Sequence, residues 1–295
     1  MSRLPHPHET IAFQGEPGAY SDLACREAYP GSTSLPCTGF EDAIAAVKEG
    51  VAALAMLPID NSVAGRVPDI HHLMPESGLH IIAEHFRAVN HHLLAVPGAG
   101  LETLKIVKSH HHALSQCRGF LRAHGLKPVV AADTAGAAAE VAARGDPSVA
   151  AIASALAGEL HGLVSLRTNI EDAAHNTTRF LVAAREPRPV IRDGRHFITT
   201  FVFRVRNVPA ALYKALGGFA TNGINMTKLE SYMVNGHFTA TQFYADVDGH
   251  PEDRNLRLAL DELRFFSHEV KILGTYPAHP FRDGMREDAF TSPGE

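Results

Sequence analysis

The stretch NTTRF, from Asn176 to Phe180, combines groups that could bind an anionic substrate. An amide, two hydroxyls, a guanidinium and an aromatic ring stand at the start of the short apolar run FLVAA. A buried guanidinium needs an anionic partner, and its planar fork matches the shape of a carboxylate. The stretch therefore indicates either a loop that begins a strand or a substrate site at the mouth of a fold.

Further polar side chains follow apolar, strand-like segments. Asp60, Asn61 and Ser62 follow LPI, Ser109 follows LKIVK, and Gln116 lies near the start of the next helical segment. Taken singly, such a hydroxyl or amide is usually a helix cap. Because functional residues of α/β sheets lie at the carboxyl ends of strands, the whole set favours a binding site at one sheet edge.

Known catalytic motifs do not account for this set. The sequence has no GxxxxGK[ST], GxGxxG or HExxH, and GEPGAYS is either a tight turn or an anion contact. The 19 histidines include the pairs His71-His72 and His91-His92 and a triplet at 110–112. Adjacent residues of a strand point to opposite faces, so we expect solvated or hydrogen-bonded histidines. We expect no metal and no cofactor.

Length, composition and charge limit the classes of protein to which this chain can belong. A chain of 295 residues with 45% hydrophobic residues suggests two or so domains with buried cores. The net charge of −5 and the absence of a basic block argue against nucleic-acid binding. No apolar run approaches the ~20 residues that span a bilayer, and no secretory signal is expected. Cys25, Cys37 and Cys117 lack zinc-like spacing, which favours a reducing cytoplasm.

Hydrophobic periodicity in the first two-thirds alternates between strand and helix, which predicts a mainly parallel α/β core. We expect Ser21 to cap a helix that runs through Tyr29, and Gly50 to end the next helix. PVVAADT and SVAAIAS each read as a strand that ends in a hydroxyl cap, at Thr134 and Ser154.

The last third has a different pattern, which follows a linker rich in proline and charge, EPRPVIRDGR. Strand, helix, two strands, helix and strand succeed one another, with a hairpin expected at Asn235-Gly236. This βαββαβ order predicts a small ferredoxin-like domain, with an unstructured tail after Pro277.

Seven stretches carry a family resemblance: AFQGEPGAYS, LPIDNSVAGRV, SHHHALSQC, DTAGAAAEVA, NTTRFLV, PAALYKAL and INMTKLES. They resemble, in order and spacing, the monofunctional prephenate dehydratases with an appended ACT regulatory domain. The resemblance implies an α/β fold with a two-lobed catalytic domain like a periplasmic binding protein, plus a ferredoxin-like ACT domain. It implies these boundaries: catalytic domain 8–186, with a second lobe at about 87–175, linker 187–197, ACT domain 198–277 and tail 278–295.

The activity that the resemblance implies is the decarboxylative dehydration of prephenate to phenylpyruvate. In the family the threonine of TRF, here Thr178, assists the departure of the hydroxyl. By the same resemblance, Arg179 would bind a substrate carboxylate and Phe180 would form an apolar contact with the substrate ring. The resemblance also implies six substrate-binding residues in the cleft: Asp60, Asn61, Ser62, Ser109, Gln116 and Asp133.

The ACT domain implies L-phenylalanine as an effector, bound at the interface of a homodimer or a dimer of dimers. The implied effector residues are Ala211, Leu212, Asn225, Met226, Glu230 and Ser231. The sequence departs from the family here, since ESRP is replaced by ESYM and a glycine before AL by alanine. Elsewhere SHPQ is replaced by SHHH, and the usual glutamate beside Asn61 by Asp60.

Two alternatives stay open. One is an arogenate dehydratase, because arogenate differs from prephenate only by an amino group in place of the keto group. The other is a non-catalytic amino-acid sensor with the same fold, which the intact TRF disfavours. Neither a nucleic acid nor a membrane is expected as a partner.

Overall fold

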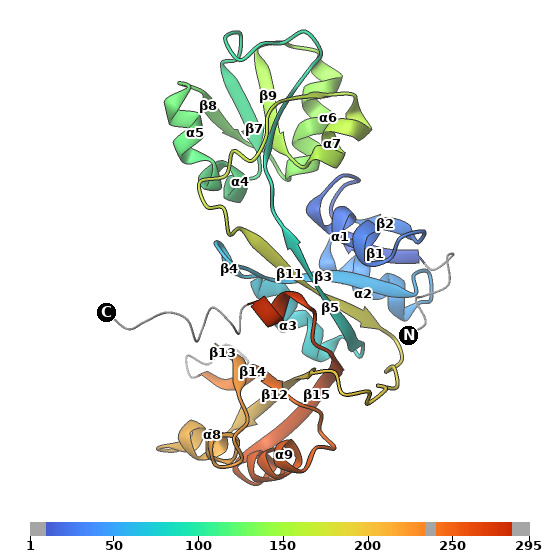
Figure 1. Cartoon of the computed structure of the whole chain (residues 1–295), viewed down its shortest axis with the longest axis vertical. Coiled ribbons are helices and arrows are strands. Elements are labelled where there is room, and N and C mark those ends of the chain that lie inside the picture. The colour runs from blue at the N-terminus through green and yellow to red at the C-terminus, as the bar shows by residue number, and fades with distance from the viewer. Residues whose placement is uncertain (1–9, 234–239, 285–295) are drawn as a thin grey trace. The chain divides into compact units, whose positions relative to one another are not determined.

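The computed structural model of the protein describes residues 10–233 and 240–284 (Figure 1). The chain divides into two compact units. The first unit contains the residues up to Ile70 together with His85–Phe180. The second unit contains His71–Glu84 together with the residues from Leu181 on. No helix in the described part is long and apolar enough to cross a membrane. The expected hairpin at Asn235-Gly236 lies outside the described residues.

The first sheet has the strand order β2-β1-β3-β11-β5, with β4 paired to β3. β1 runs parallel to both β2 and β3, as the alternating pattern predicts. β5 and β11 have residues in both units. The strands are β1 Thr10–Gln14, β2 Thr33–Cys37, β3 Leu54–Asn61, β4 Gly65–Arg66, β5 His80–Ala88 and β11 Thr177–Ala184. The helices between them are α1 Tyr20–Ala28, α2 Phe40–Lys48 and α3 Pro68–Glu76.

The second sheet, with the order β10-β6-β9-β7-β8, forms another lobe of the first unit. β7, β8 and β9 are parallel, and β6 is antiparallel to both of its neighbours, β9 and β10, so four of these five strands run in the same direction. The strands are β6 His92–Ala95, β7 Ile106–Ser109, β8 Lys127–Val130, β9 Val149–Ala153 and β10 Val164–Arg167. The helices are α4 His111–Gln116, α5 Arg118–Ala123, α6 Thr134–Arg144 and α7 Ala155–His161.

Both faces of this second sheet are covered, and the sequence of β9 shows why. All five residues of VAAIA are buried. Ala150 and Ile152 join the core under α4 and α5, while Ala151 and Ala153 join the core under α6 and α7. Figure 1 shows the two helix pairs on opposite sides of the sheet. A central strand packed on both faces reads as an uninterrupted apolar run.

Helix caps were only partly predicted. Gly50 follows the end of α2 with φ +79°, and Ser154 caps α7 by accepting from the Ala157 N–H, both as expected. Ser21 does not cap α1, because the helix already begins at Tyr20 and its N-cap position is Ala19. Thr134 is likewise inside α6, whose cap is Asp133.

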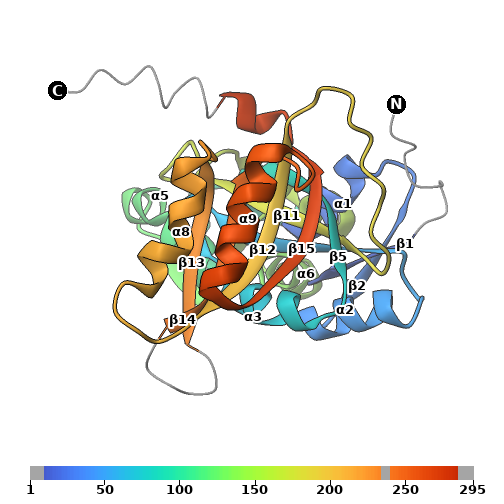
Figure 2. The same ribbon diagram turned by 90° about the horizontal axis from the view of Figure 1, so that it is seen from below.

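The C-terminal βαββαβ domain is ferredoxin-like, with the antiparallel strand order β13-β14-β12-β15. Its two helices lie side by side over one face of the sheet (Figure 2). The apolar face of α9 supplies Leu256, Leu260 and Leu263 to the core. The elements are β12 Phe197–Val205, α8 Ala211–Thr221, β13 Met226–Met233, β14 Ala240–Asp248, α9 Arg254–Phe266 and β15 Ser267–Pro277.

The segment after Pro277 is more ordered than predicted. Through residue 284 it forms a turn followed by one turn of helix, 281–284, from which Arg282 pairs with the Glu84 carboxylate, Nε to Oε1 at 2.6 Å. Glu84 also accepts a hydrogen bond from the backbone N–H of His279 at 3.0 Å. A buried carboxylate requires such partners, and the sequence gives no periodic signal for them.

Candidate active site

A cleft of about 490 Å³ opens in the first unit and is lined by both of its lobes. Thr178 and Phe180 of β11 and Asn61 of β3 line it from the first lobe. Gln116 and the triplet 110–112 line it from the second lobe. The structure therefore brings together four of the residues that the sequence predicted for one site.

Thr178 is held by a hydrogen bond from Asn61. The Asn61 Nδ2 lies 3.0 Å from the Thr178 Oγ1 and 2.8 Å from the Asn176 Oδ1, so its two hydrogens serve these two acceptors. Its Oδ1 accepts from the backbone N–H groups of Val63 and Ala64 at 3.0 and 2.7 Å, which fixes the orientation of the amide. The Thr178 hydroxyl is thus an acceptor toward Asn61 and keeps its own proton for a donor bond into the cleft.

Ser62 does not line the cleft, and its hydrogen bonds hold the start of β11 in place. Its hydroxyl donates to the His175 carbonyl at 2.7 Å and accepts from the Thr177 N–H at 2.9 Å. Its own N–H donates to the Thr177 carbonyl at 2.9 Å. Ser62, predicted to bind substrate, is in this structure a residue that positions the start of β11.

Arg179 lies away from the position predicted for it. Side chains alternate along a strand, so Arg179 points to the other face of β11 from Thr178 and Phe180, both of which line the cleft. It is buried, and its Nη1 lies 3.8 Å from the Asp60 Oδ2. Arg179 and Asp60 form an ion pair beside the site, and neither belongs to the lining of the cleft.

Ser109 and Asp133 also have structural partners. The buried Ser109 hydroxyl donates to the Ile152 carbonyl at 2.6 Å, and the Asp133 carboxylate accepts from the Gly136 N–H at 2.7 Å as the cap of α6. Neither lines the cleft. Both residues make the contacts that polar groups at strand ends and helix starts ordinarily make.

A chain of hydrogen bonds on the cleft wall was missed by the sequence reasoning. The Tyr20 hydroxyl donates to the Asn90 carbonyl at 2.8 Å and lies 2.9 Å from the His91 Nδ1. The His91 Nε2 lies 2.9 Å from the Gln116 Oε1. Burial lowers the pKa of His91, so its ring is neutral at pH 7. The sequence leaves GEPGAYS as either a tight turn or an anion contact, and it predicts solvated or hydrogen-bonded histidines, which His91 is, but it does not predict these partners.

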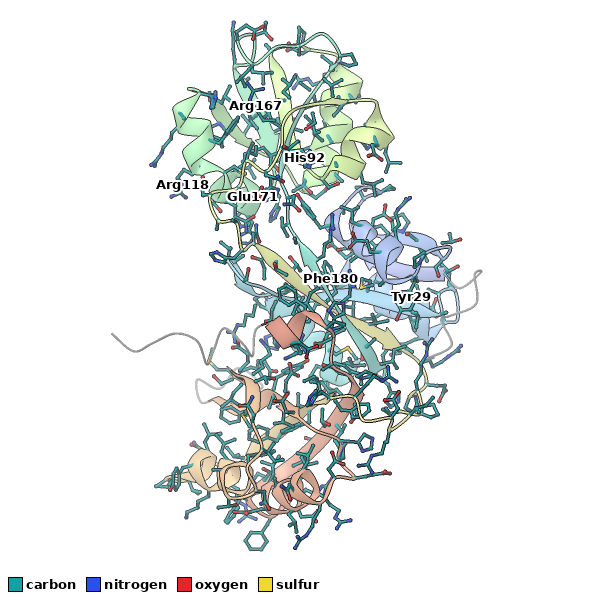
Figure 3. The ribbon with its side chains drawn as sticks, in the orientation of Figure 1. Tyr29, His92, Arg118, Arg167, Glu171 and Phe180 are labelled. Carbon is teal, nitrogen blue, oxygen red and sulfur yellow. The ribbon has the colours of Figure 1, made fainter. Side chains whose placement is uncertain are left out.

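The segments that join the two lobes meet at His91. The Glu171 carboxylate accepts from the His91 N–H at 2.8 Å, and the His91 carbonyl accepts from the Ile170 N–H at 3.1 Å. Glu171 belongs to the segment that returns from the second lobe, and Figure 3 labels it together with Phe180 on β11. These bonds tie together the two segments that connect the lobes.

The predicted effector residues lie in the ferredoxin-like domain. Ala210, just before α8, has φ +60°, a conformation that glycine adopts without steric cost. Asn225 donates to the Asp248 carboxylate at 3.1 Å, and Glu230 lies 3.5 Å from the Lys228 Nζ. Ala211, Leu212 and Met226 are half-buried against the domain core, and Ser231 pairs with Phe243 between β13 and β14.

Thiol and metal chemistry find no support among residues 10–233 and 240–284. Cys25 and Cys117 are buried, and burial raises the pKa of both thiols far above neutrality. This part of the chain holds no group of three or more histidine, cysteine, aspartate or glutamate side chains that could bind a metal ion.

The polar cleft of a two-lobed α/β unit and the separate βαββαβ domain are typical of a protein that binds a small polar metabolite and carries an added module. Residues 11–188 match the family model for prephenate dehydratase, which covers more than half of the chain. The chain belongs to the prephenate dehydratase family, whose enzymes are lyases.

Known relatives agree over nearly the whole length. The chain is 59% identical, over 92% of its length and 97% of the relative, to a bifunctional N-acyl-homoserine lactone acylase/prephenate dehydratase of Komagataeibacter europaeus. It is 40% identical, over 90% of its length and 71% of the relative, to arogenate dehydratase/prephenate dehydratase 1 of Arabidopsis thaliana. It is also similar to the crystal structure of prephenate dehydratase in complex with L-Phe from Arthrobacter aurescens, with a TM-score of 0.83 and 31% identity, covering 95% and 97% of the two chains.

Proposed function

We propose that the protein converts prephenate to phenylpyruvate in the cleft beside Thr178. The observation that carries this proposal is the Asn61–Thr178 hydrogen bond of 3.0 Å inside the region that matches the family. The bond leaves a hydroxyl proton free to face the substrate. A non-catalytic sensor would not need a hydroxyl fixed in this way.

The reaction breaks two bonds on opposite carbons of the ring. The bond from the ring to its carboxylate breaks, carbon dioxide leaves, and the electron pair enters the ring. The hydroxyl leaves from the opposite carbon as water after taking up one proton, which the solvent ultimately supplies. The aromatic ring that forms drives the reaction, so no electron-accepting cofactor is required.

Thr178 acts on the departing oxygen, because hydroxide is a poor leaving group. Its hydroxyl donates a hydrogen bond to that oxygen, while the Asn61 N–H stabilises the negative charge that builds on the Thr178 Oγ1. Phe180 presents an apolar wall to the ring. A fixed donor of this kind contributes roughly 10²–10⁴ in rate.

Replacing Thr178 by valine tests the assignment with almost no change of shape. We expect Thr178→Val to lower kcat for prephenate by about 10²–10³ with little change in KM, because the donor acts in the transition state. Phenylpyruvate formation from purified protein, read by its absorbance in alkali, measures both constants.

The matched control for this measurement is Thr177→Val. Thr177 is the preceding residue, and alternation along β11 points its side chain to the other face. The control is expected to keep near-normal kcat. Equal activity of the Thr178 variant and the natural sequence would remove Thr178 from the mechanism.

The choice between prephenate and arogenate rests on the substrate side chain, which carries a keto group or an ammonium group. The Arabidopsis thaliana relative carries both activities in its name. We propose prephenate as the main substrate, and the ratio of kcat/KM on the two purified compounds decides the matter.

The ferredoxin-like domain is proposed to be an ACT domain that binds L-phenylalanine between two copies of the chain. Its βαββαβ order and the Arthrobacter aurescens complex with L-Phe support this proposal. The exposed Asn225, just before β13, would hold the polar end of the amino acid. Inhibition would require that phenylalanine binds two states of the dimer with unequal affinity.

Asn225→Ala separates regulation from catalysis. We expect the variant to keep its kcat for prephenate and to require about tenfold more L-phenylalanine for half-maximal inhibition, because a polar contact to the ligand is lost. Asn222→Ala is the matched control, since Asn222 donates only within its own region, to the Gly218 carbonyl at 2.8 Å. Unchanged inhibition in the Asn225 variant would exclude this residue from the effector site.

A second activity, hydrolysis of N-acyl-homoserine lactones, is proposed because the relative at 59% identity carries it in its name. An apolar groove of about 480 Å³ along α4, α5 and β8 would suit an acyl chain, and His111 lines both this groove and the cleft. Water would add to the acyl carbon and the amide C–N bond would break, giving a fatty acid and the amine of homoserine lactone.

Release of that amine from a long-chain substrate, followed by mass spectrometry, tests this activity. Leu121→Ala and Thr177→Val serve as the groove variant and the control. We expect the groove variant to lose about tenfold in kcat/KM for the long chain, because an apolar contact is removed. A protein that turns over prephenate but releases no amine would exclude the second activity.

A further inference from the structure

Three consecutive imidazoles stand together on the second-lobe wall of the cleft. The ring centroids of His110 and His111 are 4.3 Å apart, those of His111 and His112 3.9 Å, and those of His110 and His112 5.3 Å. All three residues line the cleft. His111 and His112 are exposed, and the His110 Nδ1 accepts from the His112 N–H at 3.4 Å.

Few other groups in the lining of the cleft could carry positive charge. Among the described residues that line the cleft, the basic side chains are Arg66, His91 and the histidine triplet 110–112. His91 is neutral and bound to Tyr20 and Gln116. Arg179 lies outside the lining, beside Asp60. The charge for a dianionic substrate must therefore come from Arg66, the triplet or both.

The chemistry of the substrate favours the triplet for one carboxylate. Both carboxylates of prephenate are carried by one ring carbon, which lies opposite the carbon that bears the hydroxyl. With the hydroxyl at Thr178 in the first lobe, the dianionic end extends away from β11. The triplet belongs to the other lobe, where imidazolium N–H groups can donate to a carboxylate.

We propose that His111 and His112, supported by His110, form the recognition site for the side-chain carboxylate of the substrate and bind a proton together with it. The inference rests on the proposed dehydratase function and deepens it. Histidines at these two positions are what distinguish SHHH from the SHPQ of the family resemblance.

The direction of the proton transfer follows from the surroundings of the rings. Burial and the neighbouring imidazoles lower the pKa of His110 and His112, so both are mainly neutral in the free protein at pH 7.5. The Asp133 carboxylate acts in the opposite direction and raises the pKa of His110. Arg118 shares the groove lining with His111, and Arg66 and Asp69 share the cleft lining. A bound carboxylate favours the charged form, so binding takes up a proton and weakens as pH rises from 6 to 8.

The same site would discriminate between the two candidate substrates. Arogenate carries an ammonium group next to the side-chain carboxylate, where prephenate has a neutral keto group. A protonated triplet attracts the carboxylate of both compounds and repels the ammonium. Preference for prephenate should therefore grow as the pH falls and the triplet gains charge.

The test compares the natural protein with the double variant His111→Gln, His112→Gln between pH 6 and 8. We expect the variant to keep kcat within about twofold, to raise KM for prephenate about tenfold at pH 6, and to lose the rise of KM with pH. Its preference for prephenate over arogenate should no longer depend on pH. His124→Gln, an exposed histidine of the same lobe that does not line the cleft, is the matched control.

Calorimetry in buffers of different ionisation enthalpy gives a readout that does not depend on turnover. The probe is phenylpyruvate, the product, which keeps the side-chain carboxylate. We expect proton uptake on binding to the natural protein and to the His124 variant, and none with the double variant.

Unchanged KM and pH dependence in the double variant, or a fall in kcat alone, would overturn the inference. Should the natural protein fail to turn over prephenate, the proposed function fails, while proton-linked binding of the carboxylate is still decided by calorimetry. Should the double variant fail to fold, as judged by its circular dichroism, the single variants His111→Gln and His112→Gln give the same comparison.

Discussion

The site depends on one hydrogen bond, from the side-chain amide of Asn61 to the hydroxyl of Thr178. The two residues are 117 positions apart in the chain and 3.0 Å apart in space, because β3 and β11 are neighbours in one sheet. The carbonyl of Asn61 is fixed by two backbone N–H groups, so the amide cannot turn round and accept instead. A threonine hydroxyl that accepts from an amide keeps its own proton for a donor bond, and the side chain of Thr178 lines the cleft.

The second lobe supplies the opposite wall, and local packing brings it close. Gly18, in the loop before α1, has φ +90°, and a Cβ there would lie 2.8 Å from the Cα of Ala157 in α7. The Ser154 hydroxyl donates to the Gly18 carbonyl across the same contact. Glycine is required here by both the backbone conformation and the contact. The polar groups of two separate sheets can therefore act on one small molecule.

The features that could be predicted from the sequence are those set by hydrophobic periodicity and by local side-chain chemistry. The buried run VAAIA, the cap at Ser154 and the ferredoxin-like order of the last third follow from patterns of a few residues. Family motifs pointed to Asn61, Gln116, Thr178 and Phe180, and the structure places all four on the cleft. These motifs give residue types at strand ends, and strand ends are where such a cleft forms.

The differences between expectation and structure concern the direction of a side chain and the polar groups that a side chain contacts. Arg179 was expected in the cleft, but alternation along β11 turns it toward Asp60. Ser109 and Asp133 satisfy a carbonyl and a helix terminus, which the sequence alone cannot distinguish from a ligand contact. The wall formed by Tyr20 and His91 depends on contacts 70 and 71 residues apart, beyond any local pattern.

The most direct measurement of the central claim is a double-mutant cycle on kcat with Asn61→Asp and Thr178→Val. The aspartate keeps the acceptor for the Val63 and Ala64 N–H groups but cannot donate to Thr178, so the threonine proton turns toward it. If the two residues act as one donor unit, the double variant is no slower than the slower single variant. If the fold losses in kcat of the two single variants multiply in the double variant, Asn61 and Thr178 act separately, and the claim that they form one donor unit is wrong.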